Sequence, residues 1–187
     1  MRRIIASEGI TLDGYFAGSQ GEIDWQALDE EFNAYSIELL DSVDTLLFGR
    51  VTYEQMQAWW PTPAGENYST EIARRMNAAA KLVVSRKAVD ISWHNARQLA
   101  GDLPKAITEL KAGAGKDIAI LGSGSLVGQL TDQRLIDEYR LTLNPVILAE
   151  GTALFKDMQQ RHELRLIGTR QFASGTILLR YEPGPGS

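Results

Sequence analysis

Short apolar runs alternate with amphipathic segments along the first 130 residues of this chain. Four of the runs have the length of buried strands, and each ends at, or directly before, a glycine or a serine: 3–7, 45–48, 81–85 and 117–121. Runs that are apolar on both faces are typical of a parallel sheet covered on both sides.

The segments between the runs carry helical patterns. Apolar side chains recur every three or four residues in the first segment and predict one helix face: Trp25, Leu28, Phe32, Tyr35, Leu39 and Val43. Asp24 is predicted to cap this helix. A second helix is predicted to begin at Thr52, because Thr52 and Gln55 have the spacing of a capping box, and to end at Pro61 and Pro63.

Two further helices complete the alternation. One is expected over 69–79, and the other is expected to open with Pro104 in its first turn and to stop at Gly113. Parallel strands need long crossovers, so alternating strands and helices predict a mainly parallel sheet with helices on both faces.

The C-terminal part has a different pattern. Apolar and polar residues alternate over 139–144, and two apolar runs, 164–167 and 176–181, flank a turn at Ser174-Gly175. We expect an antiparallel strand set that closes one edge of the sheet and ends in a hairpin. The predicted fold class is therefore a mixed α/β single domain over 1–182, followed by a flexible tail at 183–187.

Composition narrows the function classes. The chain has 187 residues, a formal net charge of −5 and no cysteine, which excludes disulfides, thiolate metal sites and cysteine nucleophiles. The acidic balance argues against a nucleic-acid partner, and no apolar stretch approaches the ~20 residues that span a bilayer. His94 and His162 have no ligand-spaced partners. We expect a cytoplasmic protein without a metal site or a membrane partner.

Small and basic residues follow three of the predicted strands. These sets are 49–52 (Gly-Arg-Val-Thr), 85–87 (Ser-Arg-Lys) and 122–126 (Gly-Ser-Gly-Ser-Leu). Each set alone also suits an ordinary tight connection or a solvated arginine. The carboxyl ends of parallel strands meet at one rim, however, and several anion sites on one rim suit a dinucleotide. The Rossmann glycine fingerprint and the Walker A sequence are absent.

An ordered set of motifs resembles the dihydrofolate reductase-like family, and within it the C-terminal reductase domain of the riboflavin-biosynthesis deaminase-reductase. The motifs extend over nearly the whole chain and are Asp13-Gly14, Asp24-Trp25, Gly49-Arg50-Val51-Thr52-Tyr53-Glu54, Val84-Ser85-Arg86, Gly122-Ser123-Gly124-Ser125-Leu126 and Ile136-Asp137-Glu138. The resemblance implies an NADPH-dependent reductase that acts on a small heterocyclic, carbonyl or imine substrate.

The resemblance also implies roles for individual residues. Residues 49–53, including Gly49, Arg50, Thr52 and Tyr53, match the first phosphate-binding turn. Ser85 and Arg86 match the segment that meets the adenosine ribose and its 2′-phosphate, and 122–126 match the pyrophosphate turn. On the substrate side, Asp13 and Gly14 match a loop over the nicotinamide, and Trp25 falls near the substrate wall. Arg50 and Arg86 would favour NADPH over NADH.

One departure bears on the mechanism. The stretch 32–35 contains no acid where dihydrofolate reductases carry a carboxylate, which argues against folate as the substrate. Glu8, Asp13 and Asp24 are nearby acids, although Asp13 suits a turn and Asp24 a helix cap, so the proton donor is left unassigned. Trp59 and Trp60 suit packing under the sheet, an aromatic lip over a ligand, or a dimer contact.

Two alternatives to a reductase stay open. The missing carboxylate is compatible with a protein that binds NADP(H) or another phosphorylated ligand without turnover. A structural homodimer built on an edge strand or on Trp59 and Trp60 is the third hypothesis. We also expect the reductase itself to be a homodimer, as the resemblance implies.

Overall fold

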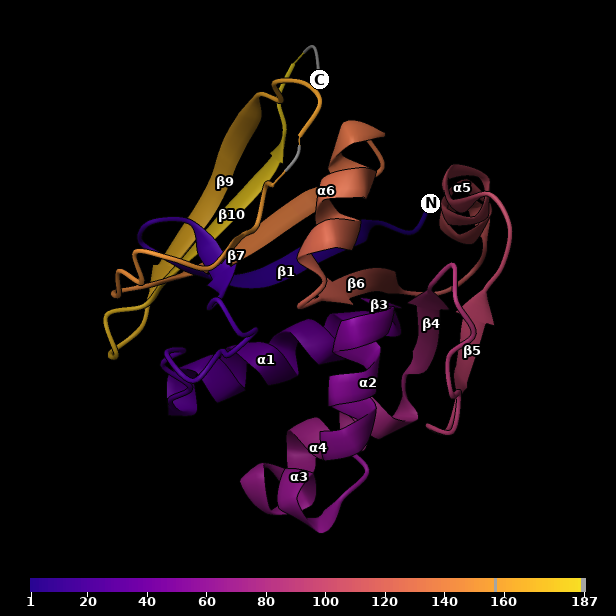
Figure 1. Cartoon of the computed structure of the whole chain (residues 1–187), viewed down its shortest axis with the longest axis horizontal. Coiled ribbons are helices and arrows are strands. Elements are labelled where there is room, and N and C mark those ends of the chain that lie inside the picture. Colours follow the sequence, from indigo (N-terminus) through magenta and orange to yellow (C-terminus); the bar gives the residue numbers. More distant parts are fainter. Residues whose placement is uncertain (157, 186–187) are drawn as a thin grey trace.

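Eight strands form one sheet in the computed structural model, which describes residues 1–156 and 158–185 (Figure 1). In spatial order they are β5 (Ala96–Leu99), β4 (Ala80–Val84), β3 (Val43–Gly49), β6 (Asp117–Leu121), β1 (Ile4–Thr11), β7 (Glu138–Asn144), β10 (Ile177–Pro183) and β9 (Leu164–Gln171). Neighbouring strands from β5 to β7 are parallel, and β10 is antiparallel to both β7 and β9. The short strands β2 (Tyr15–Ala17) and β8 (Thr152–Ala153) form a separate antiparallel pair.

Helices cover both faces of this sheet (Figure 1). One face carries α1 (Glu30–Ser42), α2 (Arg50–Trp59) and α4 (Thr70–Ala78), with the short α3 (Pro63–Tyr68) beside α4, and the other carries α5 (Leu103–Ala112) and α6 (Gly124–Asp132). The predicted fold class, a mainly parallel α/β sheet with a C-terminal antiparallel hairpin, is confirmed. Among the described residues, no helix is both long enough and apolar enough to cross a membrane.

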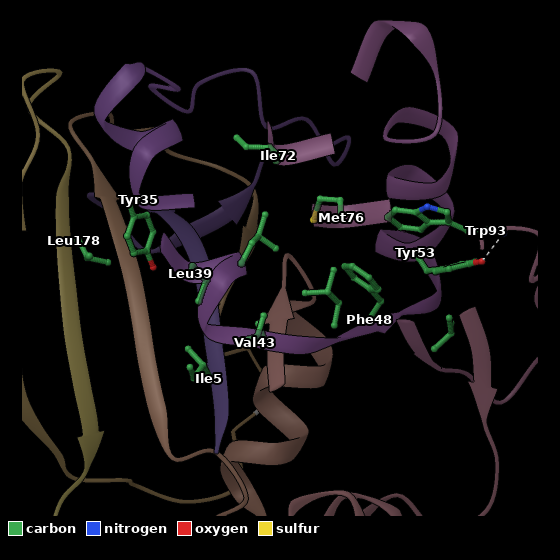
Figure 2. Close-up of a cluster of buried hydrophobic side chains, with 14 of the residues drawn as sticks. Ile5, Tyr35, Leu39, Val43, Phe48, Tyr53, Ile72, Met76, Trp93 and Leu178 are labelled. Atoms are coloured by element: carbon green, nitrogen blue, oxygen red, sulfur yellow. Dashed lines mark hydrogen bonds between the residues drawn. The ribbon is translucent and has the colours of Figure 1, made fainter. Parts of the chain in front are cut away.

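Two apolar clusters, one on each face, hold the layers together. On the α1 face, Phe48 of β3 stacks on Trp93 with ring centroids 6.3 Å apart. Figure 2 shows the Tyr53 side chain of α2 directed at Trp93, whose backbone N–H donates to the Tyr53 hydroxyl at 3.3 Å. Phe48 and Tyr53 are fully buried, so the first turns of α2 are fixed rigidly on β3.

The first helix begins later than its apolar pattern predicts. Asp29 caps it, accepting a hydrogen bond from Phe32 N at 2.7 Å, whereas Asp24 is exposed in the preceding loop. Trp25 and Leu28 also precede the helix. The prediction of Asp24 as the cap was wrong because Asp29 has a second partner from the β9–β10 connection, where Ser174 N donates to its other oxygen at 3.2 Å.

The second helix begins earlier than predicted. It starts at Arg50, and Gly49 occupies its N-cap position without a side-chain hydrogen bond. Thr52 is already inside the helix, and its hydroxyl donates to the carbonyl of Gly122 at 2.6 Å. The capping-box interpretation was wrong because a partner from the β6–α6 turn takes the Thr52 hydroxyl.

The remaining local predictions differ in outcome. The helix at Ser69 and the helix between Pro104 and Gly113 are confirmed, and so is the final hairpin. The strand predicted at 139–144 is β7, but the expectation that it pairs only in an antiparallel set was wrong, because it is parallel to β1 and antiparallel to β10. At the C-terminus, β10 continues through Pro183, and residues 186–187 of the expected tail lie outside the described residues.

Candidate functional site

A crevice opens where neighbouring strands send their helices to opposite faces of the sheet. β1 and β3 lead into α1 and α2 on one face, while β6, which lies between β1 and β3, leads into α6 on the other (Figure 1). Such a divergence leaves a gap at the carboxyl ends of the strands. A cavity of about 1250 Å³ lies there, lined by residues from β1, α1, α2 and α6.

The two helices that begin at this cavity lack side-chain caps. Among the described helices, α2 and α6 have no side-chain hydrogen bond at the N-cap, whereas the other four are capped by Asp29, Thr62, Ser69 and Asp102. The first amides of a helix have no partner within the helix, and the positive end of the helix dipole lies there. Two helix N-termini are therefore available to an anion in the crevice.

Hydrogen bonds join the two N-terminal turns to each other. The backbone N–H of Gly49 donates to Ser123 Oγ at 2.9 Å, and the Thr52 hydroxyl donates to the carbonyl of Gly122. Gly122 has a φ of +64°, and a Cβ atom there would lie 3.2 Å from Thr52 Cγ2. Glycine is thus needed at 122 both for the backbone conformation and for the close approach of α2.

Glu8 of β1 lies in the cavity wall beneath this pair of turns. Its side chain lines the cavity, the residue is 3% exposed, and Oε1 accepts a hydrogen bond from Ser123 N at 3.0 Å. Burial raises the pKa of the Glu8 carboxyl to about 8, and the backbone N–H groups of Ser123 and Gly122 offset only part of this rise. The carboxyl group is therefore mainly protonated at neutral pH.

The part of the cavity between α1, α2 and α4 is aromatic and apolar. Its walls include Phe32, Met56, Trp59, Trp60, Tyr68 and Ile72. Trp59 is 45% exposed, while Trp60 packs against the buried cluster and meets Tyr68 edge to face. The charged residues of the described cavity lining are Glu8, Asp132 and Lys156, on other elements, and Arg50, at the N-terminus of α2. This part suits an uncharged ring system.

The structure brings most of the predicted cofactor residues together. Gly49, Arg50, Thr52 and all of 122–126 line the cavity. Arg50 forms an ion pair with Glu54 one turn further along α2, with Nη1 to Oε2 at 2.8 Å. The two predicted phosphate-binding turns, which lie about 70 residues apart in the sequence, therefore face one site.

Three predicted cofactor residues lie outside the cavity lining. Tyr53 is fully buried in the core and packs against Trp93. Ser85 and the exposed Arg86 follow β4 on the same rim, because Val84 pairs with Gly49 in the sheet. Ser85 Oγ accepts from Lys87 N at 3.0 Å, which holds the turn that carries Arg86.

The predicted substrate residues shape loops beside the cavity. Asp13 accepts hydrogen bonds from the Thr11 hydroxyl and from Ala149 N, at 2.7 and 2.9 Å, and these bonds lower its pKa. Gly14 adopts a φ of +86° in the same turn. Trp25 donates from Nε1 to the carbonyl of Glu22 at 3.2 Å and is absent from the described lining. Between β1 and α1, the lining residues are Phe16 and Ala17 of β2 and, in the loop that follows, Gly21, Ile23, Gln26 and Leu28, none of which has a chemical signature in the sequence.

Comparison with solved structures places the fold of this chain in a class of α/β domains. The fold matches a dihydrofolate reductase from Enterococcus faecalis complexed with NADP(H) and RAB-propyl, with a TM-score of 0.63 and 14% identity, over 98% of this chain and 97% of that one. A Shewanella sp. PV-4 structure, provisionally described as a riboflavin biosynthesis protein, matches with a TM-score of 0.74 and 22% identity over 98% and 99% of the two chains. The domain has the dihydrofolate reductase-like fold.

The family follows from the sequence comparisons. Residues 2–178 match the model of the RibD C-terminal domain. YyaP, an uncharacterized protein of Bacillus subtilis (strain 168), is 33% identical over 180 residues, which cover 96% of this chain and 94% of YyaP. The chain belongs to the RibD C-terminal domain family.

Proposed function

We propose that this protein is an NADPH-dependent reductase that transfers a hydride to a small heterocyclic, carbonyl or imine substrate. The observation that carries the proposal is the convergence of two helix N-termini without side-chain caps on one crevice. The two phosphates of a dinucleotide backbone need two such sites at short range. Membership of the RibD C-terminal domain family and the fold shared with an NADP(H)-bound dihydrofolate reductase support the same ligand.

The residues present fit this cofactor. Open amides of α2 and α6 would receive the pyrophosphate, and Gly122 allows the backbone to approach closely. Arg86 lies exposed on the rim beyond β4, where a 2′-phosphate would meet it. When bound, NADPH supplies a hydride to an electrophilic carbon of the substrate, and one proton from solvent or a side chain completes the two-electron reduction.

The apolar half of the cavity would bind and orient the substrate. Phe32, Trp59 and Trp60 offer aromatic surface for a planar ring, and Asn33 and Gln55 offer polar groups at its edge. Closure of this half by a bound ring excludes water from the reacting carbon.

Cofactor titration tests the proposal. We expect NADPH to quench the tryptophan fluorescence with a higher affinity than NADH, and Arg86→Ala to weaken NADPH binding about tenfold with little effect on NADH. Arg74→Ala is the matched control, because Arg74 is also exposed but is not among the described residues that line the cavity. Absence of NADPH binding would remove the reductase proposal.

Turnover separates the reductase from a protein that only binds the nucleotide. Loss of NADPH absorbance is followed with a panel of quinones, aldehydes, imines and pterins. Steady consumption of NADPH with any member supports the reductase. Tight NADPH binding with no consumption across the panel supports the binding protein instead.

A further inference from the structure

Glu8 is a buried acid in the wall of the crevice. No basic side chain in the described part of the chain forms an ion pair with it, and its carboxyl group accepts backbone hydrogen bonds instead. Glu8 Oε1 accepts a hydrogen bond from Ser123 N at 3.0 Å. The hydroxyl group of the same serine accepts from Gly49 N at the start of α2. A single carboxyl group thus holds the β6–α6 turn against β1.

This hydrogen bond decides which amides remain for a ligand. Ser123 N is taken by Glu8, and the amides of Leu126 and Val127 both donate to the carbonyl of Ser123 at 2.9 Å. The amides of Gly124 and Ser125, in the first turn of α6, have no partner among the described residues. They are the donors that an anion at this turn would meet.

The charge state of Glu8 then matters for such an anion. A neutral carboxyl group can accept from Ser123 N without placing negative charge behind the turn. An ionised one would oppose a phosphate a few ångströms away in a site of low dielectric. Burial favours the neutral form.

We propose that Glu8 is a positioning residue that holds the β6–α6 turn as a neutral carboxyl group, and that its ionisation weakens the binding of NADPH to this turn. This inference rests on the proposed NADPH site. NADPH binding and protonation of Glu8 are then linked, so that each favours the other.

Other ionisable groups face the cavity or the neighbouring strands. They are Tyr35 of α1, Arg50 of α2, Asp132 of α6, Arg140 of β7 and Lys156. The hydroxyl groups of Tyr35 and Ser7 share a hydrogen bond on the opposite face of β1 from Glu8. Burial raises the pKa of Tyr35 above its ordinary value. A Glu8 variant therefore isolates the contribution of Glu8 from that of these groups.

The test is the affinity for NADPH between pH 7 and 9.5 at constant ionic strength, where the 2′-phosphate stays ionised. We expect the wild type to bind NADPH about five- to tenfold more weakly at pH 9 than at pH 7. Glu8→Gln keeps an acceptor for Ser123 N, so it should match the wild type at pH 7 and change less than about twofold across the range. Glu109→Gln, an exposed site on α5, is the control and should retain the wild-type profile.

A second measurement needs no variant. Calorimetry of NADPH binding at pH 8.5, in buffers of different ionisation enthalpy, should show net proton uptake by the wild type. Equal pH profiles for the wild type and Glu8→Gln, or binding without proton uptake, would overturn the inference while leaving the NADPH site intact. Failure to bind NADPH even at pH 7 would instead overturn the proposed function.

Discussion

Two buried glutamates of this protein have opposite ionisation behaviour. Glu138 is fully buried, and although burial alone would raise its pKa, hydrogen bonds and charge from Arg140 and Arg180 lower it to about 2. Glu8 is 3% exposed, its carboxyl group accepts from backbone N–H groups with no ion pair among the described residues, and burial raises its pKa to about 8. Burial favours the neutral form of both glutamates, and the basic neighbours of Glu138 outweigh that effect.

The Glu8 shift has a consequence for stability. Its folded-state pKa lies above the unfolded value of about 4.5, so the folded protein holds a proton that the unfolded chain releases between pH 4.5 and 8. The contribution of Glu8 is fully present below about pH 4.5 and is lost as the pH rises through 8. We expect Glu8→Gln to gain stability over the wild type by several kcal/mol between pH 5 and 8. Urea unfolding across this range measures the gain, and a constant difference between the two proteins would contradict it.

Helix starts are where long-range contacts most clearly override local patterns. Asp24 and Asp29 both precede the apolar face of α1, but only Asp29 also receives Ser174 N from the opposite end of the chain. At α2 the Thr52 hydroxyl goes to Gly122 instead of to its own helix. Which residue caps a helix thus depends on the hydrogen-bond partners that the fold brings near it.

Matched variants of the two aspartates test this choice. Asp29→Ala should lower the free energy of unfolding by about 1–2 kcal/mol, because Phe32 N and Ser174 N lose their acceptor. Asp24→Ala should change it by less than about 0.5 kcal/mol, because Asp24 is exposed. Hydrogen bonds lower the pKa of Asp29, so its contribution is lost as the pH falls through that lowered value. Equal effects of the two substitutions would contradict the assignment.

At the scale of the whole molecule, the order of the strands creates the site. Placing β6 between β3 and β1 brings the turns after three strands to one rim, and α6 leaves that rim on the face opposite α1 and α2. The two edge strands of the sheet are β5 and β9. On β9, the side chains of Leu164 and Leu166 are 36% and 51% exposed. Outer strands of this kind can pair with another copy.

We propose that the protein forms a homodimer through the edge at β9. Light scattering should give twice the 20.7 kDa of one chain. Leu166→Lys should shift the protein toward the monomer mass, while Ile147→Lys, at an exposed apolar residue outside β9, should not. A monomeric wild type would contradict the dimer, and a Leu166→Lys protein that stays dimeric would exclude this edge.

Local patterns were sufficient to predict the fold class and the positions of the turns that we propose bind phosphate. Period and turn chemistry depend on neighbouring residues, so the strand at 117–121, the helix after Ser69 and the glycine-rich turn at 122–126 follow from short stretches of sequence. The resemblance to a known family added the role that each of these turns is expected to have in binding the cofactor. None of these signals required contacts across the sheet.

Tertiary structure alone decided which of these residues meet. Glu8 reaches Ser123 across 115 positions, and Thr52 reaches Gly122 across 70, so no local pattern contains either contact. The aromatic wall from Phe32, Trp59 and Tyr68 joins three helices whose separate patterns indicate only packing. The site depends on these contacts because strand order, which is set by burial of both sheet faces at once, places distant turns at one rim.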